Sequence, residues 1–196
     1  MEATETKQIG KYKIEIIPDN DPQNPREDDN LGTMVCFHNR YTLGDKHDYN
    51  SDNYRGWDEM KDAISETENV GVILPLYLYD HSGITISTTP FSCQWDSGQI
   101  GFIFISKEKI KEEYSTTRVH KKLVKQVTEY LENKVKEYDQ YLRGEVYGFR
   151  ITDTTNGEEI DSCWGVYGEE CCMTVGESSL MNHIKYLEGL EVEGVM

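Results

Sequence analysis

The sequence has no long apolar stretch. No segment approaches the roughly 18 consecutive apolar residues that a membrane-spanning helix requires. The N-terminal segment MEATETKQIGKYKIEII is polar and lacks the apolar centre of a secretory signal. These absences predict a cytoplasmic protein that does not enter a membrane.

Motifs for nucleotides and for zinc are also missing. The chain contains neither GxGxxG nor a P-loop, and its five cysteines include no CxxC pair. An odd cysteine number without a secretion signal favours reduced thiols, although Cys171 and Cys172 are adjacent and a disulfide between them is the alternative. We therefore predict neither a cofactor nor a structural metal.

Positive charge is scarce. The chain has 36 acidic and 20 basic residues, a net charge of −16. Residues 151–196 carry a net charge of −9, whereas residues 107–150 carry +3. Such a chain repels nucleic acid and is attracted to basic surfaces, including those that normally hold nucleic acid. The simpler interpretation is that the acidic charge serves solubility.

The N-terminal part predicts two strands and two long loops. Residues 11–17 (KYKIEII) alternate apolar and charged side chains, the period of a half-buried strand. Residues 33–38 (TMVCFH) predict a second strand that pairs with the first as a wide hairpin. The segments 18–32 and 39–56 have no period and predict long loops, which are often functional or mobile.

The middle of the chain predicts a helix and two buried strands. Residues 57–66 form a short amphipathic pattern, and residues 70–79 and 99–106 are apolar throughout, as in strands covered on both faces. Pro75 predicts a bulge in the first of these strands, because proline cannot donate to a ladder. Residues 84–87 fit a short returning strand.

The C-terminal half predicts helices and a hairpin. Ser106 is a candidate N-cap, and apolar residues recur every three or four positions over 117–142, which predicts a long amphipathic helix. Asn156–Gly157 is a hairpin turn signal. The tail 171–196 is expected to be helical from Ser178.

These elements predict a single α+β domain over residues 1–196. The sheet is expected to be mainly antiparallel, with one long amphipathic helix and a C-terminal hairpin followed by a helix. No repeat and no linker divides the sequence.

A polar segment lies between the two apolar strands. Residues 80–98 are held at both ends by buried strands, a common place for binding groups. We predict that this loop carries the main functional surface, with these binding residues: Asp80, His81, Ser82, Phe91, Cys93, Trp95, Asp96 and Gln99.

Two nucleophilic chemistries fit this loop. Cys93 or Ser82 as nucleophile, with His81 as base and Asp80 or Asp96 as the acid that orients the base, would make a thiol or serine site. Asp80 and His81 are neighbours on a strand and therefore point to opposite faces, which opposes a shared target. A tight loop closed by Asx-turns, without any chemistry, is the structural alternative.

A metal site is a further option. His38, Asp45, His47 and Asp48 cluster in HNRYTLGDKHDY, and His81 with Asp80 would join them across the sheet. Histidine and carboxylate ligands suit zinc, manganese or iron. No pair of these histidines has HxH or HxxxH spacing, so we predict no metal. Whether His38, Asp45, His47 and His81 bind one is a question that the sequence leaves open.

Three segments resemble a family of uncharacterised proteins of bacteriophages and mobile genetic elements. They are YLYDHSGITISTTPFSCQWDSGQIGFIFISKEKI, HNRYTLGD and EYDQYLRGEVYGFRI…DSCWGVYG, and the resemblance runs from about residue 33 to residue 168. It implies a bacterial host-cell cytoplasm as the setting. Small acidic proteins of this origin often inhibit host defence.

The function predicted from charge and resemblance is inhibition of a host defence system, of anti-CRISPR or anti-restriction type. The partner would be a basic host protein or a protein–nucleic-acid complex, whose nucleic-acid channel the chain would bind without binding nucleic acid itself. The rival is a small-molecule or nucleotide binder, or a metal- or thiol-dependent enzyme, that uses the 80–98 loop. Exposed aromatic residues in the long loops are compatible with a homodimer.

Overall fold

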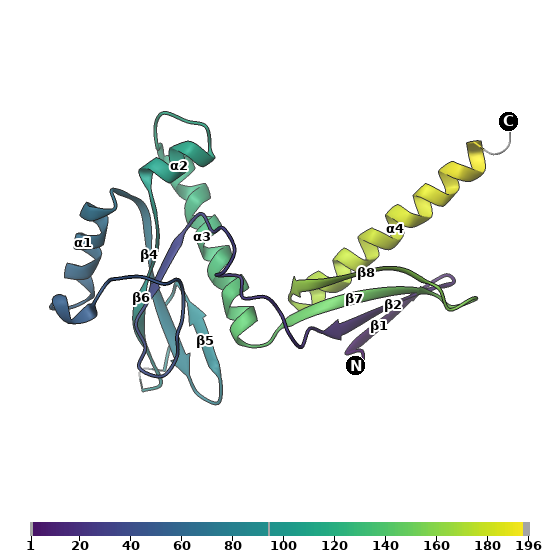
Figure 1. Cartoon of the computed structure of the whole chain (residues 1–196), viewed down its shortest axis with the longest axis horizontal. Helices are drawn as coiled ribbons and strands as arrows, with labels where there is room; N and C mark the ends of the chain where they lie inside the picture. The colour runs from purple at the N-terminus through teal and green to yellow at the C-terminus, as the bar shows by residue number, and fades with distance from the viewer. Residues whose placement is uncertain (1, 94, 194–196) are drawn as a thin grey trace. The chain divides into compact units, whose positions relative to one another are not determined.

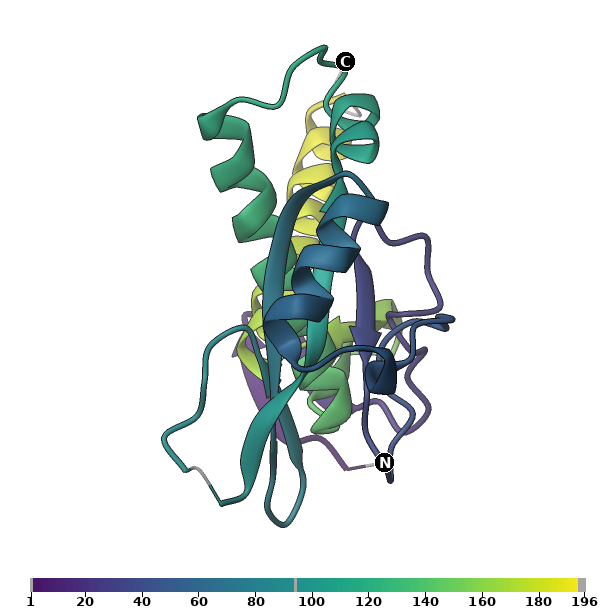
Figure 2. The same cartoon turned by 90° about the vertical axis from the view of Figure 1, so that its left-hand side faces the viewer.

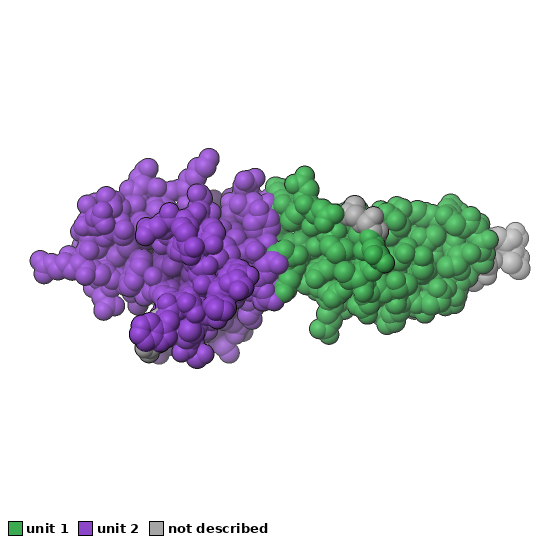
Figure 3. Space-filling view, turned by 90° about the horizontal axis from the view of Figure 1, so that it is seen from below, with its two compact units in different colours: residues 1–23, 144–196 green, residues 24–143 purple. Residues whose placement is uncertain are grey.

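The chain folds as an α+β protein with antiparallel sheets, one long amphipathic helix and a C-terminal hairpin followed by a helix, as predicted. The computed structural model describes residues 2–93 and 95–193. Its contacts divide the chain into two compact units (Figures 1 and 3). Unit 1 combines the two ends of the chain, 1–23 and 144–196, and unit 2 is the continuous segment 24–143.

Unit 1 is a four-stranded antiparallel sheet with one helix against it. The strand order is β1 (Glu5–Ile9), β2 (Tyr12–Pro18), β7 (Val146–Asp153) and β8 (Glu159–Tyr167), and α4 (Glu169–Glu193) follows β8 (Figure 1). Alternate residues of β2 and β7 point to the same face, so their apolar side chains form one surface. This surface packs with apolar residues of α4 in a core that includes Ile14, Ile16, Phe149, Ile151, Cys172, Met173 and Leu180.

Unit 2 has three layers. Its antiparallel sheet has the order β3 (Thr33–Cys36), β6 (Ser97–Ser106), β4 (Val70–Asp80) and β5 (Ile84–Ser87). Helix α1 (Trp57–Thr67) covers one face and α3 (Lys121–Leu142) covers the other (Figures 1 and 2). The short helix α2 (Lys107–Glu113) follows β6, and a 3₁₀ turn (Ser51–Asn53) precedes α1.

The two faces of this sheet have separate cores. On the α3 side, Leu131 and Val135 pack with Leu76 and Ile103 in one cluster. On the α1 side, Met60 and Ile64 pack with Val35, Phe102 and Phe104 in another. Because both faces are buried, β4 and β6 are apolar almost throughout, which explains the two apolar runs in the sequence.

The hairpin predicted between residues 11–17 and 33–38 is wrong. Strand β2 pairs with β1 and β7, whereas β3 pairs with β6 in the other sheet. Strand β1 was not predicted, because its sequence ETKQI is almost fully exposed and has no apolar alternation. Its pairing with β2 leaves β2 in the interior of the sheet of unit 1.

Two helices differ from prediction at their first residue. Helix α3 begins at Lys121 instead of 117, because His120 is its N-cap and accepts a hydrogen bond from Leu123 N through Nδ1 at 3.2 Å. Helix α4 begins at Glu169, well before Ser178, and residues 194–196 of the predicted tail lie outside the described residues.

Two local predictions are close to the structure. Ser106 is the N-cap of α2, and its Oγ accepts from Lys109 N at 3.2 Å. The irregularity predicted at Pro75 lies beside it, where the β4–β6 register shifts between Leu76 and Tyr77. Pro75 itself is in register with Phe102, and β5 pairs only with the later part of β4, so the missing N–H costs no ladder bond on that side.

Within the described part of the chain, no helix is both long enough and apolar enough to cross a membrane.

Candidate functional site

The segment 80–98 forms a hairpin and a loop at one end of the sheet of unit 2. Strand β5 lies inside it and pairs with β4 through a turn at 81–83, in which Ser82 has a φ of 57°. The described residues of the loop proper are 88–93 and 95–96, and Asp80 N donates to Asp96 O at 2.8 Å. That bond holds the two ends of the segment side by side.

Asp96 is the central group of this loop. Its Oδ2 accepts a hydrogen bond from Cys93 Sγ at 3.7 Å and lies 3.3 Å from His81 Nδ1. In a nucleophilic site the base contacts the nucleophile and the acid orients the base. In this loop the Asp96 carboxylate lies between the Cys93 thiol and the His81 imidazole. The order of the three groups therefore differs from that of a nucleophilic site.

Asp80 points away from this group. Its carboxylate pairs with the guanidinium of Arg40 from the preceding long loop. Asp80 and His81 therefore reach different targets, as the alternation of a strand requires. Two further polar side chains, one in the segment and one just after it, are engaged by the backbone: Ser97 Oγ donates to Cys93 O, and Gln99 Nε2 donates to Gly101 O at 3.3 Å.

The aromatic residues of the segment behave in two ways. The ring of Tyr79 lies 6.0 Å from that of His81 and 5.7 Å from that of Phe91, so these three rings form a small cluster. Trp95 is 96% exposed. A tryptophan in this position is available to a partner, as aromatic anchors of interfaces are. The binding roles of the eight residues named from the sequence stay predictions.

Three of the four candidate metal ligands in residues 38–48, His38, Asp45 and His47, have separate partners. His38 Nδ1 accepts from Arg40 N and Tyr41 N, and His47 Nε2 lies 3.1 Å from Cys36 O. Asp45 is bound by Arg26. Among the residues that the structure describes, no three His, Cys, Asp or Glu side chains converge so that they could hold a metal ion.

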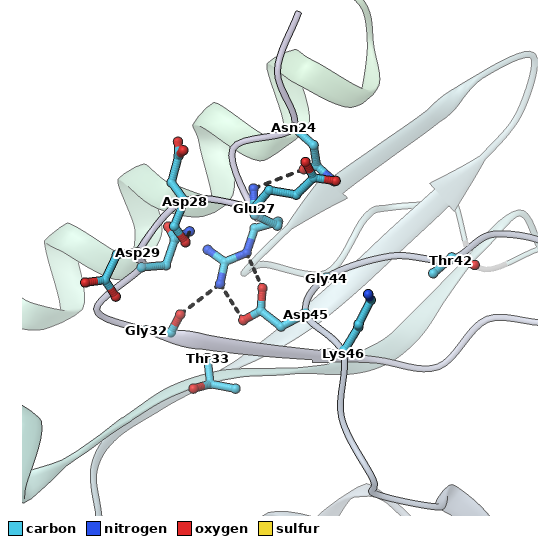
Figure 4. A pocket seen from close by; sticks show the side chains of 12 residues that line it. Asn24, Glu27, Asp28, Asp29, Gly32, Thr33, Thr42, Gly44, Asp45 and Lys46 are labelled. Atoms are coloured by element: carbon cyan, nitrogen blue, oxygen red, sulfur yellow. Dashed lines mark hydrogen bonds and ion pairs between the residues drawn. The ribbon is translucent and has the colours of Figure 1, made fainter.

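The ion pair of Arg26 and Asp45 was not predicted. Arg26 Nε donates to Asp45 Oδ1 at 2.8 Å, and its Nη2 donates to Asp45 Oδ2 at 2.6 Å and to Gly32 O at 2.8 Å (Figure 4). The Arg26 side chain is buried, and Asp45 Oδ2 also accepts from Met34 N. A signal was present in the sequence, because Arg26 is the single basic residue of the loop 18–32.

A polar depression of about 570 Å³ lies over this ion pair. Its lining includes Glu27, Asp28 and Asp29 on one side and Lys46 on the other (Figure 4). Small-molecule sites are mostly lined by apolar and aromatic groups. The lining here is largely polar and charged, which makes this depression unlike such a site.

The described cysteines are all free thiols. Burial and the nearby Asp45 carboxylate raise the pKa of Cys36 to about 12, and burial raises the pKa of Cys172 to about 11. Both are therefore uncharged thiols near neutral pH and poor nucleophiles.

Unit 1 presents the most acidic surface. It carries 16 acidic and 5 basic residues, a net charge of −11, whereas the net charge of unit 2 is −5. The sequence showed the C-terminal excess of acid. It did not show that the N-terminal strands β1 and β2, which contribute further acids, join the same unit.

No protein-family model, curated protein or solved structure matches the chain.

Proposed function

We propose that the chain is a non-enzymatic inhibitor of a bacterial defence system, carried by a phage or mobile element, that binds a basic protein surface through unit 1. The observation that carries this proposal is the charge of unit 1. Even if each of its 5 bases neutralises one of its 16 acids, eleven acids remain uncompensated.

Most of the bases of unit 1 are already paired within the unit. Four of the five bases of unit 1 are already engaged by acids of the same unit: Lys7 with Glu177, Lys11 with Asp153, Lys13 with Glu15, and Arg150 with Glu159. Exposed acids remain on the β7–β8 turn, on β8 and along α4, at Glu158, Asp161, Glu170 and Glu188. A partner of opposite charge would meet these carboxylates.

Charge of this kind acts mainly on encounter and on specificity. Complementary fields accelerate association, and like charges exclude nucleic acid from the same surface. The partner that fits is a protein with a basic face, such as the empty nucleic-acid channel of a defence complex. Screening by salt should weaken the complex.

The 80–98 loop supports a binding protein over an enzyme. The Asp96 carboxylate lies between the Cys93 thiol and the His81 imidazole, and the Asp80 carboxylate pairs with Arg40. These contacts order the loop without assembling a nucleophile and its base.

The test is a plating assay with matched charge variants. In bacteria that carry a CRISPR or restriction system, expression of the chain should restore plating of a phage that the system blocks. The unit 1 variant E158Q/E170Q/E188Q should lose this effect. The control variant D62N/E66Q/E113Q removes three exposed acids from unit 2 and should keep it.

Two results would overturn the proposal. One is that the unchanged chain restores plating against neither class of defence. The other is that both triple variants lose the effect equally, because net charge and not the surface of unit 1 would then matter.

A further inference from the structure

The sheet of unit 2 has both of its edges covered. At β3, Asp45 N donates to Met34 O at 2.8 Å, and the Asp45 carboxylate accepts from Met34 N at 2.8 Å. At β5, Ile86 N donates to Asp139 Oδ1 of α3 at 2.8 Å. These contacts protect the strands from pairing with another chain, which is a common requirement for edge strands.

The edge of β8 in unit 1 is different. Strand β8 has nine residues, most of them exposed, and among the described residues its only partner strand is β7. Since alternate residues of a strand direct their N–H and C=O groups to opposite sides, about half of β8 offers these groups to the free edge. Ser162 N donates to the Asp161 carboxylate of its own strand at 2.9 Å, a local bond that a partner strand can replace.

The side chains beside this edge are acidic and aromatic. Asp161 faces α4, where its Oδ2 accepts from Ser179 Oγ. Glu159 lies on the other face, with Arg150 and Ser162. On that face the ring of Trp164 covers Gly148, where an added Cβ would lie 2.3 Å from Trp164 Cε3.

We propose that the edge of β8 receives an extended, basic segment of the partner protein as an added strand. The proposal rests on the proposed function and specifies how unit 1 holds its partner. Backbone hydrogen bonds to β8 would supply affinity, as in other cases of strand addition, and side chains would supply selectivity.

The chemistry of the edge selects lysine and arginine. A strand added to β8 alternates its side chains between the two faces. Basic side chains on one face would meet Asp161, whose carboxylate faces α4. Those on the other face would meet Glu159 and the ring of Trp164, which is 40% exposed and offers a surface for a cation.

The shape of the edge restricts where the segment binds. The β7–β8 register shifts between Tyr147 and Phe149 and again between Ile151 and Thr152, so β8 is regular only around Asp161–Cys163. Bulges bend a strand and discourage indiscriminate pairing. We therefore place the added strand at the central part of β8.

The probe for this edge is a capped peptide of alternating lysine and valine that matches β8 in length. Its controls are the same peptide with alternate backbone amides N-methylated and a peptide with glutamate in place of lysine. Titration calorimetry gives affinity, and amide hydrogen exchange by NMR locates the site. We expect the lysine peptide to bind at low salt and to slow exchange along 159–165.

The N-methylated peptide keeps the charge of the lysine peptide but loses backbone N–H groups that would donate hydrogen bonds to a neighbouring strand. We expect it to bind about tenfold more weakly, the loss that two hydrogen bonds explain, and the glutamate peptide should not bind. Replacing Trp164 by alanine should also weaken the lysine peptide about tenfold. Replacing Trp95, an exposed tryptophan of unit 2, should leave its affinity unchanged.

Equal affinity of the methylated and unmethylated peptides would overturn strand addition and leave the acidic-surface proposal intact. Protection at β1 or in unit 2, or no binding of the lysine peptide, would also overturn it. The plating assay is independent of these peptides. Failure of the proposed function is therefore recognised in that assay alone, when expression of the chain does not restore plating of the blocked phage.

Discussion

The guanidinium of Arg26 and the carboxylate of Asp45 form a two-point ion pair that joins the long loop before β3 to the loop after it. The Arg26 side chain is 3% exposed and that of Asp45 is 22% exposed. Both loops are polar and have almost no regular structure of their own. This contact and the hydrogen bonds from Arg26 to Gly32 O and from Met34 N to Asp45 tie the two loops to each other and to β3.

We expect Arg26→Met to lower the free energy of unfolding by about 3 kcal/mol, because removal of one partner leaves a partly buried charge uncompensated. The double variant R26M/D45N should recover part of this loss. Urea denaturation of the wild type, both single variants and the double variant measures the coupling. Losses below about 0.5 kcal/mol, the usual size of a surface substitution, would show that the loops are ordered by other contacts.

Two glycines of β6 give a matched pair for packing. A Cβ at Gly101 would lie 1.9 Å from Val35 O, whereas a Cβ at Gly98 would meet no atom within 4 Å. We expect Gly101→Ala to destabilise unit 2 by about 1–3 kcal/mol or more, because β3 has to move away from β6. Gly98→Ala should be neutral or slightly stabilising. Thermal and urea denaturation compare them, and equal effects would contradict the close approach of β3 and β6.

The pKa of Asp153 is lowered to about 2 by hydrogen bonds from Lys11 and from Thr155. Its ordinary value is 3.8. Above about pH 4 the carboxyl is ionised in both the folded and the unfolded chain, and the hydrogen bonds to the carboxylate favour the folded chain. The stability it contributes should be fully present at neutral pH, decline as pH falls below about 4, and vanish as pH falls through about 2.

We therefore expect Asp153→Asn to lower the melting temperature at pH 7 and to match the wild type near pH 2. Lys11→Met, which removes the largest cause of the shift, should follow the same pattern more weakly. Melting curves recorded from pH 7 to pH 2 test this. A difference that is constant with pH would assign the role of Asp153 to packing.

Trp95 and Trp57 differ in what they contact. Trp95 is 96% exposed, whereas the ring of Trp57 lies 5.8 Å from that of Phe102 and 6.2 Å from that of Phe37. We expect Trp95→Ala to change the free energy of unfolding by less than about 0.5 kcal/mol, and Trp57→Ala to cost about 3 kcal/mol. Urea denaturation gives both values. A large cost at Trp95 would mean that its ring is packed.

The elements that the sequence predicts well are those whose buried residues follow a regular pattern. The runs of β4 and β6 are apolar because both faces of the sheet are covered, and α3 carries its apolar stripe from Leu123 to Tyr138. Strand β1 has no such pattern, because it is an exposed edge strand that pairs with β2 through its backbone. Pairing of β2 with β7 joins distant segments, which local periodicity does not encode.

The candidate site was predictable in position and less so in geometry. The sequence placed Asp80, His81, Cys93 and Asp96 in one segment between buried strands. That Asp96 stands between Cys93 and His81 follows from the return of the loop beside β4, which the bond from Asp80 N to Asp96 O fixes. The spacing of these residues along the chain does not reveal that the loop returns beside β4.

Unit 1 is assembled from the first and the last strands of the chain, and this order has a consequence for biosynthesis. Residues 24–143 leave the ribosome before β7 and β8, as a continuous segment that contains all the strands of one sheet, so unit 2 can fold while the chain is still growing. Strands β1 and β2 must wait until β7 has left the ribosome before the sheet of unit 1 can close. Prior folding of unit 2 replaces a long flexible loop by a fixed body and so reduces the entropy cost of that closure. The acidic surface thus forms last, and a truncated translation product that ends before β7 lacks the eleven of its 16 acids that follow residue 143.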